Sequence, residues 1–320
     1  MGRTTSPRIS AIVCTYRNPG LLEGAITSLL NQTLSPDRYE IIVVDNNSRD
    51  QTPEVVRRLG HTSSPPVSYV LETRQGLSHA RNRGVEAARS DIVAFLDDDA
   101  EADSGWLWAL LEAYERSPDT WAAGGRISPI WHTSERPTWW TEEYDRSLSL
   151  LDWGDEARAL TWPERILGTN CSFRRSVFEE LGYFDPALGR RGTALLGHEE
   201  TDIQHRIHLA NKVVFYTPGA IVRHHVPQER LTEEYFFRRQ FGASRSQMVV
   251  MLKREGYASA IPRVAADCLA MVQRLLIITG LFFRTRGEIT FVDKRMLFHY
   301  WGHLVGFAEG ALGARFRLDR

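Results

Sequence analysis

The feature that most restricts the fold of this 320-residue chain is a short apolar run that ends in three consecutive carboxylates. Residues 92–96 are all apolar, and Asp97, Asp98 and Asp99 follow them directly. A run of this kind is typical of a buried strand in a parallel sheet. Adjacent like charges repel unless a cation lies among them, and carboxylate oxygens suit Mg2+ or Mn2+. The run therefore predicts either a metal site at the end of a buried strand or a solvated acidic turn.

The same alternation of apolar runs and helical spacing fills the first third of the chain. Strands are predicted over residues 9–14, 41–44, 67–71 and 92–96, with helical patterns at 21–30, 50–59 and 77–88 between them. This order predicts an α/β fold with a mostly parallel sheet flanked by helices, in which ligands bind at the carboxyl ends of the strands. Those ends have Thr15, Asp45 and Asp97. A Gly-x-Gly-x-x-Gly motif and a Walker loop are absent from the sequence, which disfavours dinucleotide binding and P-loop chemistry.

The alternation of strand and helix patterns stops after a predicted helix at 103–116 and a predicted strand at 121–127. Residues 128–165 read as one long loop, and they contain five of the nine tryptophans: Trp131, Trp139, Trp140, Trp153 and Trp162. Long loops inside a domain are usually functional. Aromatic rings suit the apolar faces of sugars or a lipid chain, but they also form small packed clusters. The loop therefore predicts either an acceptor-binding surface or a satellite core.

Acidic and histidine residues form two further candidate sites. The helix predicted over residues 199–210 opens with Glu199, Glu200 and Asp202. Acids in a first helical turn are favoured by the helix dipole, although one of them near a substrate could act as general base. The strand at 220–224 ends in His224 and His225. This pair is either an ordinary surface feature or, near a carboxylate cluster, a source of metal ligands.

The C-terminal part is predicted to be helical, at about 232–252, 258–284 and 290–313. From residue 230 onward there are 15 Lys and Arg against 8 Asp and Glu, a charge of +7; because the whole chain is −1, residues 1–229 have −8. The most apolar run, residues 275–283, is far shorter than the ~20 residues that span a bilayer. With basic and aromatic neighbours it could lie in a membrane interface. The alternative is a helical hairpin that packs on the first domain or on another subunit.

Three cysteines, Cys14, Cys171 and Cys268, are far apart and odd in number. This argues against a disulfide framework or a zinc site, and it is consistent with a reducing compartment.

Six motifs, taken in order, resemble the family 2 glycosyltransferases. They are residues 12–18, 43–48, 76–84, 95–99, 168–170 and 199–202. The resemblance implies the GT-A fold, an inverting reaction, a nucleotide-sugar donor and a divalent cation, Mn2+ or Mg2+. It also implies a catalytic domain over residues 1–230, with an acceptor region at about 128–200. Residues 231–320 would be a helical region for membrane association or oligomerisation.

The resemblance assigns roles residue by residue. It assigns the nucleotide sugar to Thr15, Tyr16, Asp45, Arg81, Asp97, Asp98 and Asn170, and the metal to Asp99 and His224, with His225 in reserve. The family's Glu-Asp pair reads Glu199-Glu200 here, and the second position implies Glu200 as general base. Glu199 and Asp202 remain rivals for that role and, with Trp139 and Trp140, are candidate acceptor contacts.

The implied activity is transfer of a sugar, from a UDP-sugar before a dTDP- or GDP-sugar, to a hydroxyl of a saccharide or lipid-linked acceptor. The expected location is the cytoplasmic face of a membrane, with peripheral contact through the C-terminal helices and a possible homo-oligomer. Nucleic acid is not an expected partner, because the basic surplus lies in apolar helices rather than on a polar arm. The alternatives are a catalytically silent sugar- or nucleotide-binding relative and a sugar nucleotidyltransferase.

Overall fold

The computed structural model describes residues 6–61, 63–285 and 290–312, without the side chains of 277–285 and 312. The chain divides into two compact units. The first, the sheet unit, consists of Met1–Ser134, Glu142–Gly192 and Glu199–Pro227. The second, the helical unit, consists of Glu135–Thr141, Thr193–His198 and Gln228–Arg320. Two short segments from the predicted acceptor region thus belong to the helical unit.

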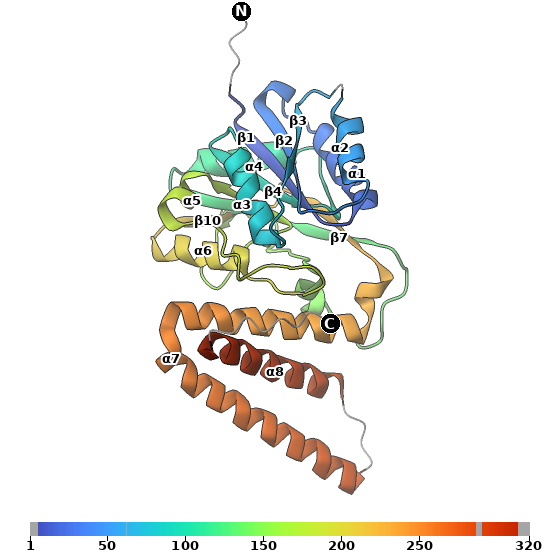
Figure 1. Cartoon of the computed structure of the whole chain (residues 1–320), viewed down its shortest axis with the longest axis vertical. Coiled ribbons are helices and arrows are strands. Elements are labelled where there is room, and N and C mark those ends of the chain that lie inside the picture. Colours follow the sequence, from blue (N-terminus) through green and yellow to red (C-terminus); the bar gives the residue numbers. More distant parts are fainter. Residues whose placement is uncertain (1–5, 62, 286–289, 313–320) are drawn as a thin grey trace, which may run out of the picture. The chain divides into compact units, whose positions relative to one another are not determined.

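An eight-stranded sheet in the order β3-β2-β1-β4-β9-β6-β10-β8 forms the centre of the sheet unit (Figure 1). Its strands are β1 (Ile9–Thr15), β2 (Tyr39–Asp45), β3 (Val67–Leu71), β4 (Ile92–Asp97), β6 (Thr120–Gly124), β8 (Arg158–Ala159), β9 (Asn170–Arg174) and β10 (Val213–Tyr216). The first four strands in this order are mutually parallel, and β9 runs antiparallel to both β4 and β6. The predicted α/β architecture with a mostly parallel sheet is confirmed.

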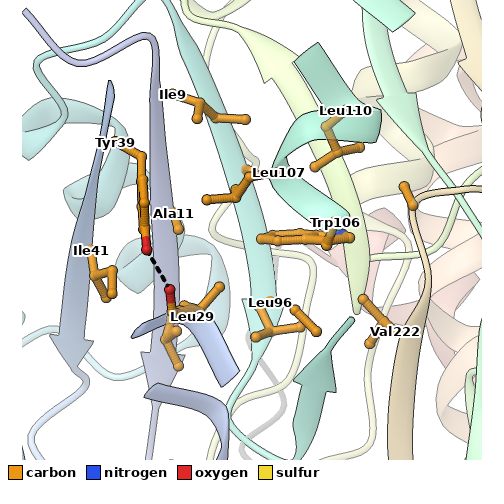
Figure 2. Close-up of a cluster of buried hydrophobic side chains, with 14 of the residues drawn as sticks. Ile9, Ala11, Leu29, Tyr39, Ile41, Leu96, Trp106, Leu107, Leu110 and Val222 are labelled. Carbon is orange, nitrogen blue, oxygen red and sulfur yellow. Dashed lines mark hydrogen bonds between the residues drawn. The ribbon is translucent and has the colours of Figure 1, made fainter. Parts of the chain in front are cut away.

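Helices pack against both faces of this sheet. They are α1 (Pro19–Leu30), α2 (Thr52–Gly60), α3 (Leu77–Ala87), α4 (Trp106–Arg116), α5 (Ser176–Leu181) and α6 (Glu199–Leu209), with 3-10 turns at Pro36–Arg38 and Glu142–Leu148. Successive residues of β1 point to opposite faces, so that Ala11 packs in one hydrophobic cluster and Ile12 in the other. Trp106 of α4 is fully buried at the centre of the first cluster (Figure 2). There the Tyr39 hydroxyl donates to the carbonyl oxygen of Leu29 at 2.9 Å.

A second, three-stranded sheet was not predicted. It has the order β5-β11-β7, from β5 (Ala100–Ala102), β11 (Val222–Val226) and β7 (Ile127–Trp131). The prediction of one loop over residues 128–165 is therefore wrong at its start. Pro129 in the middle of β7 argues against a strand in sequence terms, because proline cannot donate to a ladder. The parallel partner β11 nevertheless holds it in place.

The helical unit consists mainly of α7 (Glu233–Thr285) and α8 (Phe291–Leu312), after a 3-10 turn at Gln228–Leu231. Gly256 interrupts α7 with a φ of 77°, a left-handed conformation that glycine adopts without penalty. We call residues 233–255 the first arm of α7 and residues 257–285 its second arm. In Figure 1, α8 lies between the two arms.

Close approach of α8 to the first arm depends on glycine. A Cβ atom added to Gly302 would lie 2.6 Å from the carbonyl oxygen of Phe241, and one added to Gly306 would lie 2.6 Å from that of Arg245. Among the described residues, no helix is long and apolar enough to cross a membrane. Most of the apolar run at 275–283 lies outside the described side chains.

Candidate active site

A cleft opens at the carboxyl ends of β1 and β4, where the sequence predicted a ligand site. Among the residues that line it are Thr15, Tyr16, Asp97, Asp98, Asp99 and His224. They come from three separate stretches of the sheet unit. The register of β1 against β4 sets Cys14 beside Asp97, so the residues that follow both strands meet at one edge of the sheet.

Hydroxyl groups hold the first two carboxylates of the acidic triplet. Thr15 Oγ1 donates to Asp98 Oδ2 at 2.6 Å, and Thr169 Oγ1 donates to Asp97 Oδ2 at 2.6 Å. Burial, followed by repulsion from the Asp99 carboxylate, raises the pKa of Asp98 to about 7. A rise of this kind reports negative charge concentrated in a partly desolvated space, and such a space favours a cation.

The second sheet brings His224 next to Asp99, 125 positions earlier in the chain. Strand β11 runs antiparallel to β5, with His224 opposite Ala100, and the backbone N–H of His225 donates to the carbonyl oxygen of Asp99 at 2.9 Å. As a result His224 Nε2 lies 3.2 Å from Asp99 Oδ1, and both side chains are almost buried.

These two groups fit a divalent cation. A carboxylate oxygen and an imidazole nitrogen are both accepted by Mn2+, and neighbouring ligands of an octahedral ion lie roughly 3 Å apart. The reserve candidate, His225, points elsewhere. Its Nδ1 lies 2.8 Å from His132 Nε2, and its Nε2 lies 3.2 Å from Glu101 Oε1.

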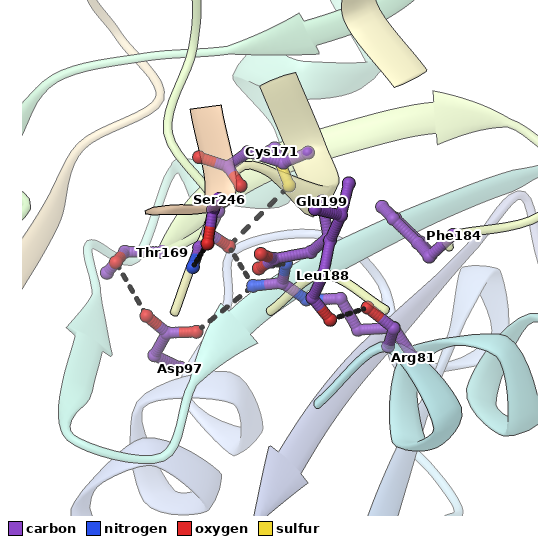
Figure 3. A network of polar contacts seen from close by, with 12 residues as sticks. Arg81, Asp97, Thr169, Cys171, Phe184, Leu188, Glu199 and Ser246 are labelled. Atoms are coloured by element: carbon purple, nitrogen blue, oxygen red, sulfur yellow. Dashed lines mark hydrogen bonds and ion pairs between the residues drawn. The ribbon is translucent and has the colours of Figure 1, made fainter. Parts of the chain in front are cut away.

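Arg81 of α3 is buried behind the acidic triplet rather than lining the cleft. Its Nη1 donates to Glu199 Oε1 at 2.6 Å, and its Nη2 lies 3.5 Å from Asp97 Oδ1 and 3.2 Å from the carbonyl oxygen of Gly168 (Figure 3). Burial is the largest single influence on Arg81 and opposes its charge, but Glu199, Cys171, Asp97 and Glu200 together outweigh it and hold the pKa of the guanidinium above its usual range. Arg81 thus joins the end of β4 to the start of α6.

Gly168 leaves the space that this guanidinium occupies. A Cβ atom there would lie 2.6 Å from Arg81 Nη2. The 168–170 motif therefore needs glycine at position 168, because a larger residue would collide with the Arg81 guanidinium.

Replacement of Arg81 by methionine should lower the free energy of unfolding by ~3–5 kcal/mol, because it leaves the Glu199 carboxylate buried without its partner. The measurement is urea unfolding followed by tryptophan fluorescence. The matched control is Arg83→Met on the same helix, where a half-exposed pair with Glu86 is lost and a change of at most about 1 kcal/mol is expected. Equal losses in the two variants would contradict the linking role of Arg81.

The three acidic residues that open α6 differ in their ion-pair partners. Glu199 is held by Arg81, and Asp202 pairs with Arg206 at 2.8 Å. Glu200 is half-buried, and within the described residues no basic side chain forms an ion pair with it. Of the three, Glu200 is therefore the carboxylate not committed to an arginine, although it is not among the described residues that line the cleft.

Asp45 and Asn170 also lie off the cleft, and both make internal hydrogen bonds. Asp45 accepts from the backbone N–H of Ser48 and from the Tyr69 hydroxyl, each at 2.8 Å. Asn170 is fully buried; its Oδ1 accepts from Trp106 Nε1 at 2.8 Å, and its Nδ2 donates to the carbonyl oxygen of Ala220 at 2.7 Å. Asp45 shapes the loop after β2, and Asn170 fastens the sheet to α4.

Sequence reasoning missed three polar residues of the cleft, Asn46, Gln75 and Arg190. Asn46, directly after β2, lines it and accepts from the backbone N–H of Gly76 at 2.8 Å through its Oδ1. Arg190 is the only lysine or arginine among the described residues that line the cleft. Its carbonyl oxygen accepts from the N–H of Leu77 at 2.9 Å, which fixes its segment against α3. The position of Asn46 at a strand end was a usable signal, whereas the loop position of Arg190 gave none.

Trp139 and Trp140 belong to the helical unit. Trp139 stacks on Phe291 with ring centroids 4.6 Å apart and an angle of 15°, and both tryptophans contact the ring of Phe236. These contacts form an aromatic cluster within that unit. The acceptor role of the two residues remains a prediction.

Comparison with known proteins gives consistent matches. The model of glycosyl transferase family 2 matches residues 10–182. Glucosyl-dolichyl phosphate glucuronosyltransferase of Haloferax volcanii is 29% identical over 254 residues, which cover 77% of this chain and 78% of that protein. Succinoglycan biosynthesis protein ExoM of Rhizobium meliloti is 28% identical over 233 residues, which cover 72% of this chain and 70% of that protein.

Among solved structures, the chain resembles the mannosyltransferase PcManGT from Pyrobaculum calidifontis in complex with GDP-Man and Mn2+. The two share a TM-score of 0.61 and 21% identity over 98% of this chain and 89% of the other. At this identity the similarity establishes a common fold.

Proposed function

Since the chain belongs to glycosyl transferase family 2 and is a glycosyltransferase with the GT-A fold, we propose that it transfers a sugar from a nucleoside diphosphate sugar to an acceptor hydroxyl with inversion. The observation that supports this most is the contact of Asp99 Oδ1 with His224 Nε2 at 3.2 Å, beside the Thr15–Asp98 hydrogen bond. A UDP-sugar is the first candidate donor. The GDP-mannose bound to the neighbour makes a GDP-sugar the second.

The donor lies in the cleft, with its nucleoside toward Thr15, Tyr16 and Asn46 at the ends of β1 and β2. Asp45 acts on the donor only indirectly, because its hydrogen bonds shape the loop that presents Asn46. Arg190, as the basic residue of the cleft, contacts the diphosphate, which a guanidinium can bind through two parallel hydrogen bonds.

Asp99 and His224 would hold Mn2+ or Mg2+, and Asp97 and Asp98 would contact the ribose, the diphosphate or water. When present, the cation neutralises charge that develops on the departing diphosphate. Thr15 and Thr169 keep the carboxylates of Asp98 and Asp97 in fixed orientations, so these side chains need little reorganisation when the donor binds.

Glu200 is the general base. The acceptor oxygen attacks the anomeric carbon from the face opposite the diphosphate, forms the new C–O bond as the bond to phosphate breaks, and passes its proton to the Glu200 carboxylate. Protonation of Glu199 would remove its negative charge and so weaken its ion pair with Arg81 at 2.6 Å, which makes Glu199 the poorer base. Arg81 and Glu199 instead hold the start of α6, and with it Glu200, against the acidic triplet.

The acceptor is a saccharide, and a lipid-linked saccharide is the first form to test. The relative from Haloferax volcanii is named for action on glucosyl-dolichyl phosphate. In the helical unit, the second arm of α7 exposes Leu269 (59%), Val272 (49%) and Leu276 (65%) along one side. Apolar side chains at this spacing beside basic residues support peripheral contact of the helical unit with a membrane surface. Such contact supports the proposed location at the cytoplasmic face of the membrane.

The donor is tested by thermal shift with UDP-, GDP- and dTDP-sugars, each with Mn2+ and with EDTA. One nucleotide should raise the melting temperature in Mn2+, and EDTA should remove most of the rise, because a ligand that binds only the folded state stabilises it. No rise with any nucleotide sugar would contradict the proposed donor class.

The acceptor is tested with the donor so identified, using water-soluble and lipid-linked saccharides. Co-sedimentation with liposomes that contain anionic lipid tests the membrane contact, with Leu269→Asp/Leu276→Asp as the variant and Leu209→Asp, an exposed leucine of α6, as the control. Sedimentation that the double variant leaves unchanged would refute membrane contact through α7, while the transfer assay would still decide the acceptor.

A further inference from the structure

Three potential metal ligands meet inside the helical unit and have no part in the function proposed above. They are Asp267, His299 and His303, and one ligand atom of each lies within 4.8 Å of the other two. Asp267 is 6% exposed and His303 is 2% exposed, while His299 is half-buried. Burial of this kind distinguishes the group from acidic or histidine clusters on a wet surface.

The fold of the helical unit explains why these residues meet. His299 and His303 are four residues apart on α8, so their rings lie on the same face of the helix, with centroids 4.3 Å apart. Asp267 comes from the second arm of α7, after the interruption at Gly256. Three ligands from two antiparallel helical segments are thus aimed at one point.

The first arm of α7 supplies hydrogen-bond partners to both rings. Ser244 Oγ lies 2.8 Å from His299 Nδ1, and Gln247 Oε1 lies 3.4 Å from His303 Nε2. Each ring therefore has one nitrogen oriented by the first arm of α7. The other nitrogen is Nε2 in His299 and Nδ1 in His303, and the latter contacts Asp267. Partners of this kind fix ring orientation and tautomer around metals in proteins.

One hydrogen bond joins two of the three candidate ligands. His303 Nδ1 lies 2.7 Å from Asp267 Oδ2, a distance at which the two atoms share a proton. Such a proton and a divalent metal compete for the same lone pairs, so metal binding would release it.

We propose that Asp267, His299 and His303 bind a divalent transition metal, with Zn2+ as the best fit. Two imidazole nitrogens and one carboxylate oxygen are a common zinc donor set, with a water molecule in the fourth position. The site differs in chemistry from the cleft, since Mg2+ and Mn2+ prefer sites richer in oxygen. The bound ion joins the second arm of α7 to α8, and its loss loosens the helical unit.

The test uses the full-length protein, stripped with EDTA and then titrated with Zn2+ against a chromophoric zinc indicator. Wild type should bind one zinc ion more than His299→Ala and Asp267→Asn. Since loss of a ligand's hydrogen-bond partner alone costs about 10–100-fold in affinity, loss of a ligand should cost at least about 100-fold, and Ser244→Ala about tenfold. The Asp99→Asn variant of the cleft should retain this zinc ion.

The matched control is His208→Ala, which removes an exposed histidine of α6 and should leave zinc binding unchanged. Circular dichroism checks that each variant is folded. If His299→Ala does not fold, the graded loss in Ser244→Ala decides. Wild type that binds no more zinc than the ligand variants would overturn the proposal and leave a hydrogen-bonded triad that serves packing alone.

Discussion

Replacement of Glu200 by glutamine is expected to lower kcat by about 100- to 10,000-fold, the usual contribution of a general base. The amide has nearly the same shape but cannot accept the acceptor's proton. Nucleotide-sugar affinity should stay unchanged, because Glu200 is not among the described residues that line the donor cleft. The measurement is single-turnover transfer, combined with a donor Kd from calorimetry.

Two further variants make this result specific. Glu180→Gln removes an exposed carboxylate of α5 and should leave both kcat and donor affinity at wild-type values. Glu199→Gln weakens the ion pair with Arg81, so its main effect should be on the free energy of unfolding. Full turnover in Glu200→Gln together with a large kcat loss in stably folded Glu199→Gln would reverse the assignment of the two residues.

Replacement of Asp99 by asparagine should weaken Mn2+ binding in the presence of nucleotide by at least about 100-fold, because it removes a charged ligand rather than one of its neighbours. Transfer at a fixed low Mn2+ concentration should fall by a similar factor and recover in part at high Mn2+. His224→Ala should have a comparable effect, since its Nε2 lies 3.2 Å from Asp99 Oδ1. In the double variant, the loss of Mn2+ binding free energy should be smaller than the sum of the losses in the two single variants, as expected for residues that act on one ion.

His225→Ala is the control for this pair. It removes the same side chain one position along β11, where the ring contacts Glu101 and His132 instead of Asp99. Mn2+ affinity, measured by electron paramagnetic resonance of free Mn2+, should match wild type. A larger loss in His225→Ala than in His224→Ala would show that the metal ligand had been assigned to the wrong histidine.

The first half of the fold was predictable because its signal is local. Each of the first four strands is a short apolar run with a turn or an acid at its end, and helical spacing separates the runs. Strands β5 and β7 gave no comparable signal. Ala100–Ala102 is too short to show a period, and Pro129 lies inside Ile127–Trp131. Their ladder with β11 depends on residues more than 90 positions away, which no local pattern reveals.

The candidate site divides in the same way. Thr15 and Asp97 to Asp99 were predictable, since polar residues that end parallel strands share one edge of the sheet. Arg81, Asp45 and Asn170 were grouped with them from the motifs, yet the structure gives all three internal hydrogen bonds. A motif position shows that a residue matters, but it does not distinguish contact with a ligand from support of the residues that make it.

The acidic triplet shows what each level determined. Consecutive residues suffice to predict that three carboxylates end a buried strand, because an apolar run followed by charge can be read directly along the chain. The partners of these charges depend on the three-dimensional fold: Asp97 contacts Thr169 and Arg81, Asp98 contacts Thr15, and Asp99 contacts His224. The reason is physical, since a side chain's partner in a low-dielectric interior is set by whichever distant segment the fold brings within about 3 Å, and chain order does not encode that distance.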